Sequence, residues 1–402
     1  MSECGVSIDN MKVEKAQVVD AAIAGLDFLV RNQCIDDCDA NCGRFPFIYD
    51  CVNEKITKLS PNWVTGTATE ALLVGYRFTG QEKYLDAATC AIGYIKTLQD
   101  FSTFNDFSYG GIHETTPRCP NCHPRDAVTA AWAMLDWSVE TGDSECYERA
   151  LLFAEWFMKF AIADNYPVCT VDFKDGVVEP YEFASCHGGS AFFFYRLYVL
   201  TGKEKYKNMM YEILQFFNKY HLDSAGKTSS LLDRSTYKLQ VDSLKKGVNG
   251  GILWGIMHEY NDDFGALANL AAYSVEKEPS CLDGAKRFLK FLARSQRADG
   301  GFGPEDFSVP SAGGSAVIEF LASRSLGLNW VDQETIDNAV SYLFSRQFRK
   351  SGSPADGAFL GVSQVYELSN TLANMRITSY AIMALLRYAG AVDPYYFFDT
   401  SF

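Results

Sequence analysis

Apolar residues along most of the chain recur at intervals of three or four positions, which is the spacing of one face of an α-helix. Recurring turn and loop phrases separate these stretches, so each stretch can be assigned to one helix. The pattern predicts twelve helices in six pairs. Their expected ranges are 13–32, 62–79, 83–99, 125–141, 143–162, 186–201, 204–220, 263–276, 280–296, 312–326, 333–347 and 373–390.

Two short phrases repeat along the chain. The first is Thr-Gly followed within six residues by Tyr, and its copies begin at Thr79, Thr141 and Thr201, about sixty residues apart. Glycine suits the left-handed position that ends a helix before a tight turn into an antiparallel neighbour. The second phrase ends a helix with glutamine and continues into a loop glycine. Its four copies are Gln33 with Gly43, Gln99 with Gly110, Gln296 with Gly300, and Gln347 with Gly357.

The two members of each helix pair differ in composition. The second member is richer in small residues, as at 65–69 and 312–316, which lets helices crowd at the centre of a ring. The first member carries more Lys, Glu and Arg, as expected of an outer, half-solvated helix. We therefore expect an all-α fold, an (α/α)6 toroid of six helical hairpins with inner and outer helix rings, formed by residues 1–402 as a single domain. The alternative is an open solenoid, which would need polar capping repeats at both ends.

Composition and net charge limit the partners that we expect for this protein. Apolar residues make up 48% of the chain, enough for a large core, and the formal net charge is −14. Nucleic acids and anionic membranes are bound mainly through Lys and Arg, so we expect neither as a partner. The N-terminus has no basic segment followed by an apolar run, so we expect a cytoplasmic protein.

The loops from outer to inner helices are long, whereas the inner-to-outer turns hold only a few residues. Function is expected on the long-loop side. Four of the five histidines fall in these loops, namely His113, His123, His187 and His258. In a closed ring the long loops converge on one cavity, and we expect the chemistry there.

Two carboxyl groups that face each other across a sugar can cleave a glycosidic bond, one as an acid and the other as a base or nucleophile. We favour Asp126 and Asp263, because the inner helices that they begin could face each other across the cavity. Glu114 is a third catalytic candidate, and His187 and His258 are expected near the reacting sugar. Each aspartate alone could instead be an ordinary helix N-cap.

Aromatic and polar residues of the same loops are candidates for substrate binding. Trp63, Tyr109 and Trp254 could stack against sugar rings, although large aromatic residues are also common in cores. The polar candidates are His113, Arg125 and Arg376.

The cysteines raise a different possibility. Cys119, Cys122 and His123 offer three potential metal ligands within five residues, and Cys186, beside His187, is a fourth. Thiolates and imidazole at this density suit tetrahedral zinc. The spacing is not that of a standard zinc finger, so free thiols in tight loops are the alternative. We expect no cofactor, with bound zinc as the competing hypothesis.

At this level the chain resembles the six-hairpin glycosidase-like superfamily, which comprises glycoside hydrolases, polysaccharide lyases and sugar epimerases on (α/α) toroids. The resemblance is carried by the Thr-Gly turns, the segment from Gln33 to Pro46 and Ala298-Asp-Gly-Gly-Phe302, and it extends over nearly the whole chain. It implies a carbohydrate-active enzyme, with a glycoside hydrolase acting on oligosaccharides as our preferred interpretation.

Fragments of two other toroid families define alternatives. The segment 296–302 is similar to the Gln-rich repeat of terpene cyclases and prenyltransferases. Cys186-His187-Gly188 is similar to the zinc-binding Cys-His-Gly of lanthionine synthetase C-like proteins. Both imply a zinc- or thiol-dependent enzyme that uses the Cys and His loops. A sugar epimerase or polysaccharide lyase using His, Tyr and Arg is a further alternative, and a helical-repeat binding module is the non-enzymatic one.

Overall fold

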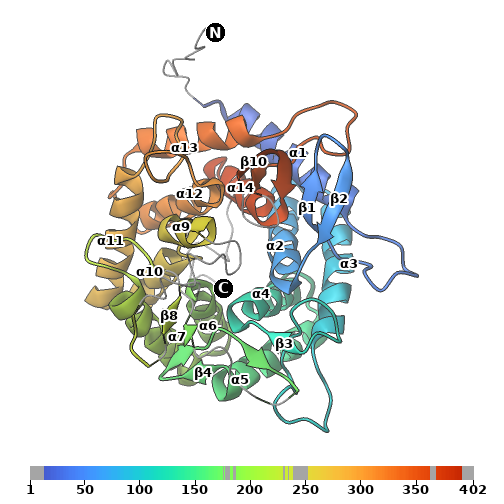
Figure 1. The fold of residues 1–402 in the computed structure, drawn as a ribbon, viewed down its shortest axis with the longest axis vertical. Helices are drawn as coiled ribbons and strands as arrows, with labels where there is room; N and C mark the ends of the chain where they lie inside the picture. Colours follow the sequence, from blue (N-terminus) through green and yellow to red (C-terminus); the bar gives the residue numbers. More distant parts are fainter. Residues whose placement is uncertain are drawn as a thin grey trace.

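The helices form two concentric rings (Figure 1). The computed structural model describes residues 13–174, 176, 182–183, 187–229, 231–233, 235–238, 252–362 and 368–391. The inner ring consists of α2 (Asn62–Thr79), α4 (Pro124–Thr141), α6 (Gly188–Thr201), α10 (Gly265–Glu276), α12 (Pro310–Ser325) and α14 (Met375–Tyr388). The outer ring consists of α1 (Lys15–Asn32), α3 (Glu82–Leu98), α5 (Ser144–Phe160), α7 (Glu204–Phe216), α11 (Pro279–Arg294) and α13 (Gln333–Arg346).

Each inner helix packs against the next one in chain order, and α14 packs against α2. That last contact closes the ring, so the open solenoid is excluded and the expected toroid is confirmed. The twelve predicted helices are all present. Their ends lie within two residues of the predicted ones, except that α7 passes at its end into the π-helical turn η1 (Phe217–His221).

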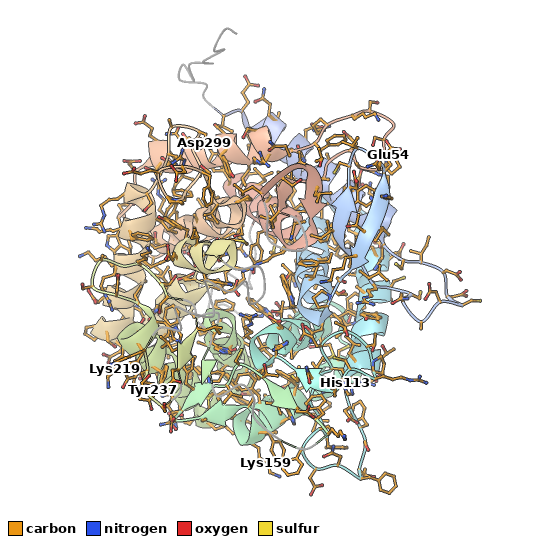
Figure 2. All side chains as sticks on the ribbon, in the orientation of Figure 1. Glu54, His113, Lys159, Lys219, Tyr237 and Asp299 are labelled. Carbon is orange, nitrogen blue, oxygen red and sulfur yellow. The ribbon has the colours of Figure 1, made fainter. Side chains whose placement is uncertain are left out.

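The inner helices approach so closely that only small residues fit between them. A Cβ atom on Gly66 of α2 would lie 2.7 Å from the carbonyl oxygen of Thr129 on α4. A Cβ atom on Gly314 of α12 would lie 2.9 Å from the carbonyl carbon of Tyr380 on α14. The outer helices instead expose charged side chains such as Lys159 (Figure 2). Small residues in the sequence therefore mark the helices of the inner ring, and charged residues mark those of the outer ring.

The inner helices end as the repeated Thr-Gly phrase predicts. Gly80, Gly142 and Gly202 follow α2, α4 and α6 with φ of +67°, +76° and +65°, and each backbone N–H donates to the carbonyl four residues earlier. Such left-handed caps allow the chain to reverse within a few residues. No helix among the described residues is long and apolar enough to cross a membrane.

The glutamines of the second repeated phrase join neighbouring hairpins. The Gln33 side-chain amide donates to the carbonyl of Gly43 in its own loop and to that of Ala87 on α3, both at 2.9 Å. The equivalent pairs of bonds run from Gln99 to Gly110 and Arg149, from Gln296 to Gly300 and Thr335, and from Gln347 to Gly357 and Ala21. The last pair connects α13 back to α1, across the point where the ring closes.

The loop glycines of this phrase allow the loop backbone to lie directly on the next outer helix. Gly43 has φ of +89°, and a Cβ there would lie 1.9 Å from the carbonyl oxygen of Cys90. Gly357 has φ of +94°, with the same 1.9 Å to the carbonyl oxygen of Ala24. No side chain can be accommodated at either position, so each long loop starts from a fixed place.

The long loops contain strands that the sequence analysis did not predict. Four of them form an antiparallel sheet in the order β2-β1-β10-β9, in which Ile48 pairs with Asn374. Their bounds are β1 (Pro46–Asp50), β2 (Lys55–Leu59), β9 (Leu360–Val362) and β10 (Leu368–Asn374). The expectation of an all-helical chain thus holds for the two rings and not for the loops. The sheet forms because ring closure brings the loops of the first and last hairpins together.

Shorter elements complete the loop side. Three two-residue ladders pair β3 with β6, β4 with β5, and β7 with β8. Helix α9 (Ile252–Tyr260) lies in the segment predicted to be a long loop before α10. The ladder strands are β3 (Asn121–Cys122), β4 (Ile162–Ala163), β5 (Tyr166–Pro167), β6 (Val171–Asp172), β7 (Glu182–Phe183) and β8 (Leu232–Asp233).

The role of the glutamines can be tested at the ring closure. Replacing Gln347 with Ala removes two hydrogen bonds and leaves the Ala21 and Gly357 carbonyls without these donors. We expect the free energy of unfolding to fall by about 1–3 kcal/mol, measured by denaturant titration. Gln81→Ala is the matched control, because Gln81 precedes α3 without a side-chain capping bond. Equal stability of the two variants would contradict a structural role for the two Gln347 hydrogen bonds.

Candidate active site

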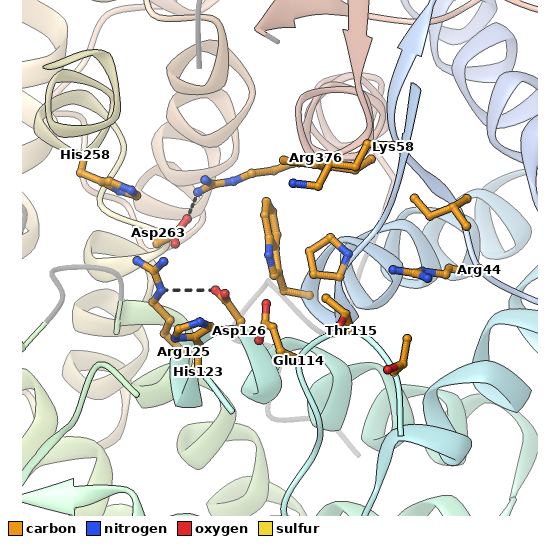
Figure 3. Close-up of a pocket in the computed structure, with 15 residues that line it drawn as sticks. Arg44, Lys58, Glu114, Thr115, His123, Arg125, Asp126, His258, Asp263 and Arg376 are labelled. Carbon is orange, nitrogen blue, oxygen red and sulfur yellow. Dashed lines mark hydrogen bonds and ion pairs between the residues drawn. The ribbon is translucent and has the colours of Figure 1, made fainter. Parts of the chain in front are cut away.

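A cavity of about 610 Å³ opens at the long-loop end of the ring. Its walls come from the first turns of α2, α4 and α14, from the residues before α10, and from the β1–β2 hairpin (Figure 3). The lining residues are Arg44, Phe47, Lys58, Leu59, Pro61, Trp63, Glu114, Thr115, Thr116, His123, Arg125, Asp126, His258, Asp263 and Arg376.

Glu114 and Asp126 form a pair of adjacent carboxyl groups on one wall (Figure 3). The Glu114 backbone is held on both sides, because its N–H donates to the Asn121 carbonyl at 3.0 Å and its carbonyl accepts from the Asn62 N–H at 2.8 Å. Burial, followed by the charge of the nearby Asp126, raises the pKa of Glu114 well above its usual range. Both effects favour the protonated form of Glu114.

Asp126 lies in the first turn of α4, three residues after His123. Its carboxylate is 3.3 Å from Nε of Arg125, and the positive end of the helix dipole also favours a negative charge there. His123 occupies the N-cap position of α4, so the N-cap alternative for Asp126 does not apply. The side chain is instead directed to the cavity.

Asp263 and Arg376 form a second group of charged residues in the cavity (Figure 3). The Arg376 guanidinium lies between the rings of Trp63 and Tyr380, 5.3 Å from each centroid, and donates a hydrogen bond to the Asp263 carboxylate. Arg376 is buried, and this arrangement fixes its orientation. An ionised carboxylate is therefore stabilised at Asp263 by charge pairing.

The turn that carries Asp263 is strained. Asp263 and Phe264 are consecutive non-glycine residues with φ of +49° and +71°. Left-handed backbone costs roughly 1 kcal/mol or more for such residues, and it persists where the surroundings enforce it. The preceding Asp262 accepts the Ala266 N–H at 2.6 Å and so caps α10, which leaves the Asp263 carboxylate free to face the cavity.

Beneath this turn, Asp262 faces Glu319 of α12, and both side chains are fully buried. Burial raises the pKa of Asp262 to about 6. Burial and the Asp262 charge raise the pKa of Glu319 well above its usual range. The raised pKa values favour the protonated forms of the pair, which supports the strained turn from the core side.

His258 of α9 also lines the cavity. Its side chain is buried, and burial together with the Arg376 and Arg125 charges lowers its pKa well below the usual range. The imidazole is neutral at physiological pH. Of the sequence-predicted residues, the structure brings Trp63, Glu114, His123, Arg125, Asp126, His258, Asp263 and Arg376 together at this one cavity.

Three other candidates lie away from the cavity. His187 is fully buried, packs edge-on against Tyr166 with centroids 5.1 Å apart, and has its pKa lowered well below the usual range by burial. Tyr109 is 39% exposed on the α3–α4 loop. His113 packs against Phe173 away from the centre of the ring (Figure 2). The sequence places these residues in the right loops but does not give the direction of their side chains.

The proposed zinc ligands do not converge in the described part of the chain, where only the exposed Asp36, Asp37 and Cys38 bring three candidate ligand atoms within 4.8 Å of one another. Nδ1 of His123 is 3.2 Å from the Cys169 carbonyl oxygen. Burial raises the pKa of the Cys122 thiol well above its usual range, which disfavours the thiolate that zinc needs. Cys119 directs its thiol to the Asn121 carbonyl oxygen.

Two candidates fall outside the described residues. These are Cys186, the fourth proposed zinc ligand, and the side chain of Trp254, a proposed sugar-stacking group. Zinc binding by this chain stays a prediction.

The cavity residues that the sequence analysis missed include two cations, Arg44 and Lys58. Arg44 directly follows Gly43 of the repeated glutamine–glycine phrase, and that adjacency was the available signal. Lys58 reaches the cavity only through the β1–β2 hairpin, and no pattern in the sequence indicated that hairpin.

Comparison with known proteins gives matches by structure alone. No protein-family model matches the chain, and no curated protein matches it by sequence. An unsaturated glucuronyl hydrolase from Bacillus sp. is similar with a TM-score of 0.69 at 17% identity, covering 95% of this chain and 99% of that one. The chain has the (α/α)6 toroid fold.

Two further solved structures show the same fold. A cellobiose 2-epimerase from Bacillus thermoamylovorans matches with a TM-score of 0.69 at 11% identity, covering 94% of this chain and 100% of that one. An α-1,6-mannanase from Salegentibacter sp. matches with a TM-score of 0.63 at 14% identity, covering 92% and 99%. These proteins are six-hairpin glycosidase-like toroid enzymes, so the expected architectural resemblance is confirmed.

The buried carboxyl pair beneath the site predicts a pH dependence of stability. Because the folded-state pKa of Asp262 is raised to about 6, its contribution to stability is present below about pH 4 and is lost as pH rises through about 6. The loss is on the order of 3 kcal/mol. Glu319 adds a loss of the same sign.

Glu319→Gln should remove part of this loss. We expect the stability of the variant relative to wild type to increase between pH 4 and pH 8, measured by thermal unfolding across that range. Glu305→Gln, at an exposed position, should follow wild type throughout. Parallel curves for Glu319→Gln and wild type would show that the buried pair does not retain its protons.

Proposed function

We propose that the protein is a glycoside hydrolase that cleaves oligosaccharides in this cavity. One observation carries the proposal: the cavity presents carboxyl groups in different environments, Glu114 with a raised pKa beside Asp126, and Asp263 paired with the Arg376 cation. Two carboxyl groups whose surroundings separate their protonation states are the requirement for glycosidic bond hydrolysis.

The residues have distinct roles in the proposed reaction. The Glu114–Asp126 pair donates its proton to the glycosidic oxygen as the bond to the anomeric carbon breaks. Asp263 acts as the second carboxylate, either by taking a proton from the attacking water or by attacking the anomeric carbon itself. Arg125 then stabilises the negative charge left on the acid pair, since its Nε is 3.3 Å from the Asp126 carboxylate.

Sugar binding is attributed to the aromatic and neutral polar part of the same wall. Trp63 and Phe47 line the cavity with ring centroids 5.8 Å apart in an edge-to-face arrangement, and such faces suit the apolar side of a sugar ring. His258, which is neutral, can donate or accept a hydrogen bond with a sugar hydroxyl.

The structurally similar proteins support the glycoside hydrolase proposal by analogy. The mannanase is described in complex with α-1,6-mannotriose as an inactive variant in which two consecutive aspartates are replaced by asparagine. The glucuronyl hydrolase is described as responsible for glycosaminoglycan degradation. Oligosaccharides are therefore the substrates that we assign to this chain.

The proposal is tested by assaying wild type and variants on a panel of oligosaccharides. Glu114→Gln and Asp263→Asn should each lower kcat by about a thousandfold while the fold, followed by circular dichroism, is unchanged. In wild type kcat should fall as pH rises through the raised pKa of Glu114, because the acid must hold its proton. Release of new reducing ends is the readout.

Asp306→Asn provides the control, because Asp306 is an exposed carboxylate that does not line this cavity. Its activity should equal that of wild type. Full activity of both Glu114→Gln and Asp263→Asn would contradict the assigned roles. Conversion of the sugar to an epimer without cleavage would instead assign the cavity to epimerisation.

A further inference from the structure

Two cations of the cavity are not explained by the proposed hydrolysis. Arg125 and Arg376 are each paired with an aspartate. Arg44 and Lys58 line the same cavity, and neither lies within 4.0 Å of a carboxylate oxygen in the part of the chain that the structure describes. The site therefore carries positive charge without a matching partner, in a protein whose formal net charge is −14.

Arg44 is the stronger observation because its side chain is only 7% exposed. Its Nε donates to the Ser60 carbonyl at 2.6 Å, its Nη1 donates to Oδ1 of Asn41 at 2.9 Å, and its guanidinium lies 5.6 Å from the Tyr94 ring centroid. These neutral partners fix the orientation of the guanidinium but do not neutralise it. Burying a cation without a counter-charge is costly, so a position of this kind is best explained by an anion that binds there.

Lys58 supplies the second cation from an exposed position on β2. Its ammonium nitrogen lies 5.4 Å from the Phe47 ring centroid. Figure 3 shows Lys58 extending over the cavity next to Arg376, while Arg44 enters from the side of the β1–β2 hairpin. The two cations thus border the aromatic surface to which sugar binding is assigned.

We propose that the substrate is an acidic oligosaccharide, with a carboxylate or sulfate substituent bound by Arg44 and Lys58 while its ring lies on Trp63 and Phe47. This inference rests on the proposed function, since it presumes that the cavity takes a sugar. An arginine held by other bonds is well suited to such a group, because its remaining N–H groups match the planar geometry of a carboxylate or the oxygens of a sulfate.

The test compares oligosaccharides that differ in charge and share a backbone. Trigalacturonate, its methyl ester and a pair of sulfated and unsulfated disaccharides are titrated into the protein by calorimetry, and their hydrolysis is followed in parallel. We expect the acidic member of at least one pair to bind at least about tenfold more tightly than its neutral counterpart. The affinity should also fall with added salt. Which pair responds distinguishes carboxylate from sulfate.

Variants of Arg44 and Lys58 test whether these two cations cause the preference for acidic oligosaccharides. Arg44→Gln should weaken binding of the acidic ligand by about tenfold or more, and Lys58→Gln by a smaller factor, and each variant should lower the ratio of acidic-ligand to neutral-ligand affinity. Lys55→Gln is the matched control, because Lys55 is an exposed lysine of the same strand that does not line the cavity. Lys58→Gln keeps the test valid if Arg44→Gln fails to fold.

The outcomes separate this inference from the proposed function. Cleavage of neutral oligosaccharides with no preference for acidic ones, and no effect of Lys58→Gln, would overturn the inference and leave the hydrolase assignment standing. Absence of binding and cleavage for every oligosaccharide, neutral or acidic, would overturn both.

Discussion

The architecture depends on a pair of hydrogen bonds made by one glutamine at each of four helix exits. Each amide group links the start of its own long loop to the backbone of the next outer helix, as Gln33 does with Gly43 and Ala87. These hydrogen bonds fix the point where each long loop begins, and a loop that begins at a fixed point can hold its later residues in place. The bonds therefore also help to position residues of the candidate active site. Arg44 directly follows Gly43, and Glu114 lies four residues after Gly110, whose carbonyl accepts the Gln99 hydrogen bond.

Ring closure and charge placement act together at the cavity. Burial and the Asp126 charge favour the protonated form of Glu114, whereas the Arg376 cation stabilises the Asp263 carboxylate. Hydrolysis needs these two states at one pH, and a single environment could not supply both. The strained backbone at Asp263 is compatible with this interpretation, because strain is retained where the surroundings require a side chain in a particular place.

The sequence predicts the rings well because their signals are local and repeated. Helical spacing defines the helices, and the small residues of α2 and α12 distinguish inner from outer. Asp126 and Asp263 were predicted to lie at the cavity because the sequence places them near the starts of inner helices, and both line it. The β2-β1-β10-β9 sheet was missed because its strands are short and its central pair, β1 with β10, joins opposite ends of the chain. Lys58 depends on that sheet, and His187 was misplaced because position in a loop does not fix side-chain direction.

The central claim is that Glu114 holds a proton at neutral pH while facing the cavity. Infrared difference spectroscopy of wild type against Glu114→Gln measures this directly, because a protonated carboxyl group has a carbonyl band that is distinct from the carboxylate bands. We predict that wild type at pH 7 shows such a band and that the variant lacks it. An identical carbonyl region in the two proteins at pH 7 would contradict the account of the acid in this site.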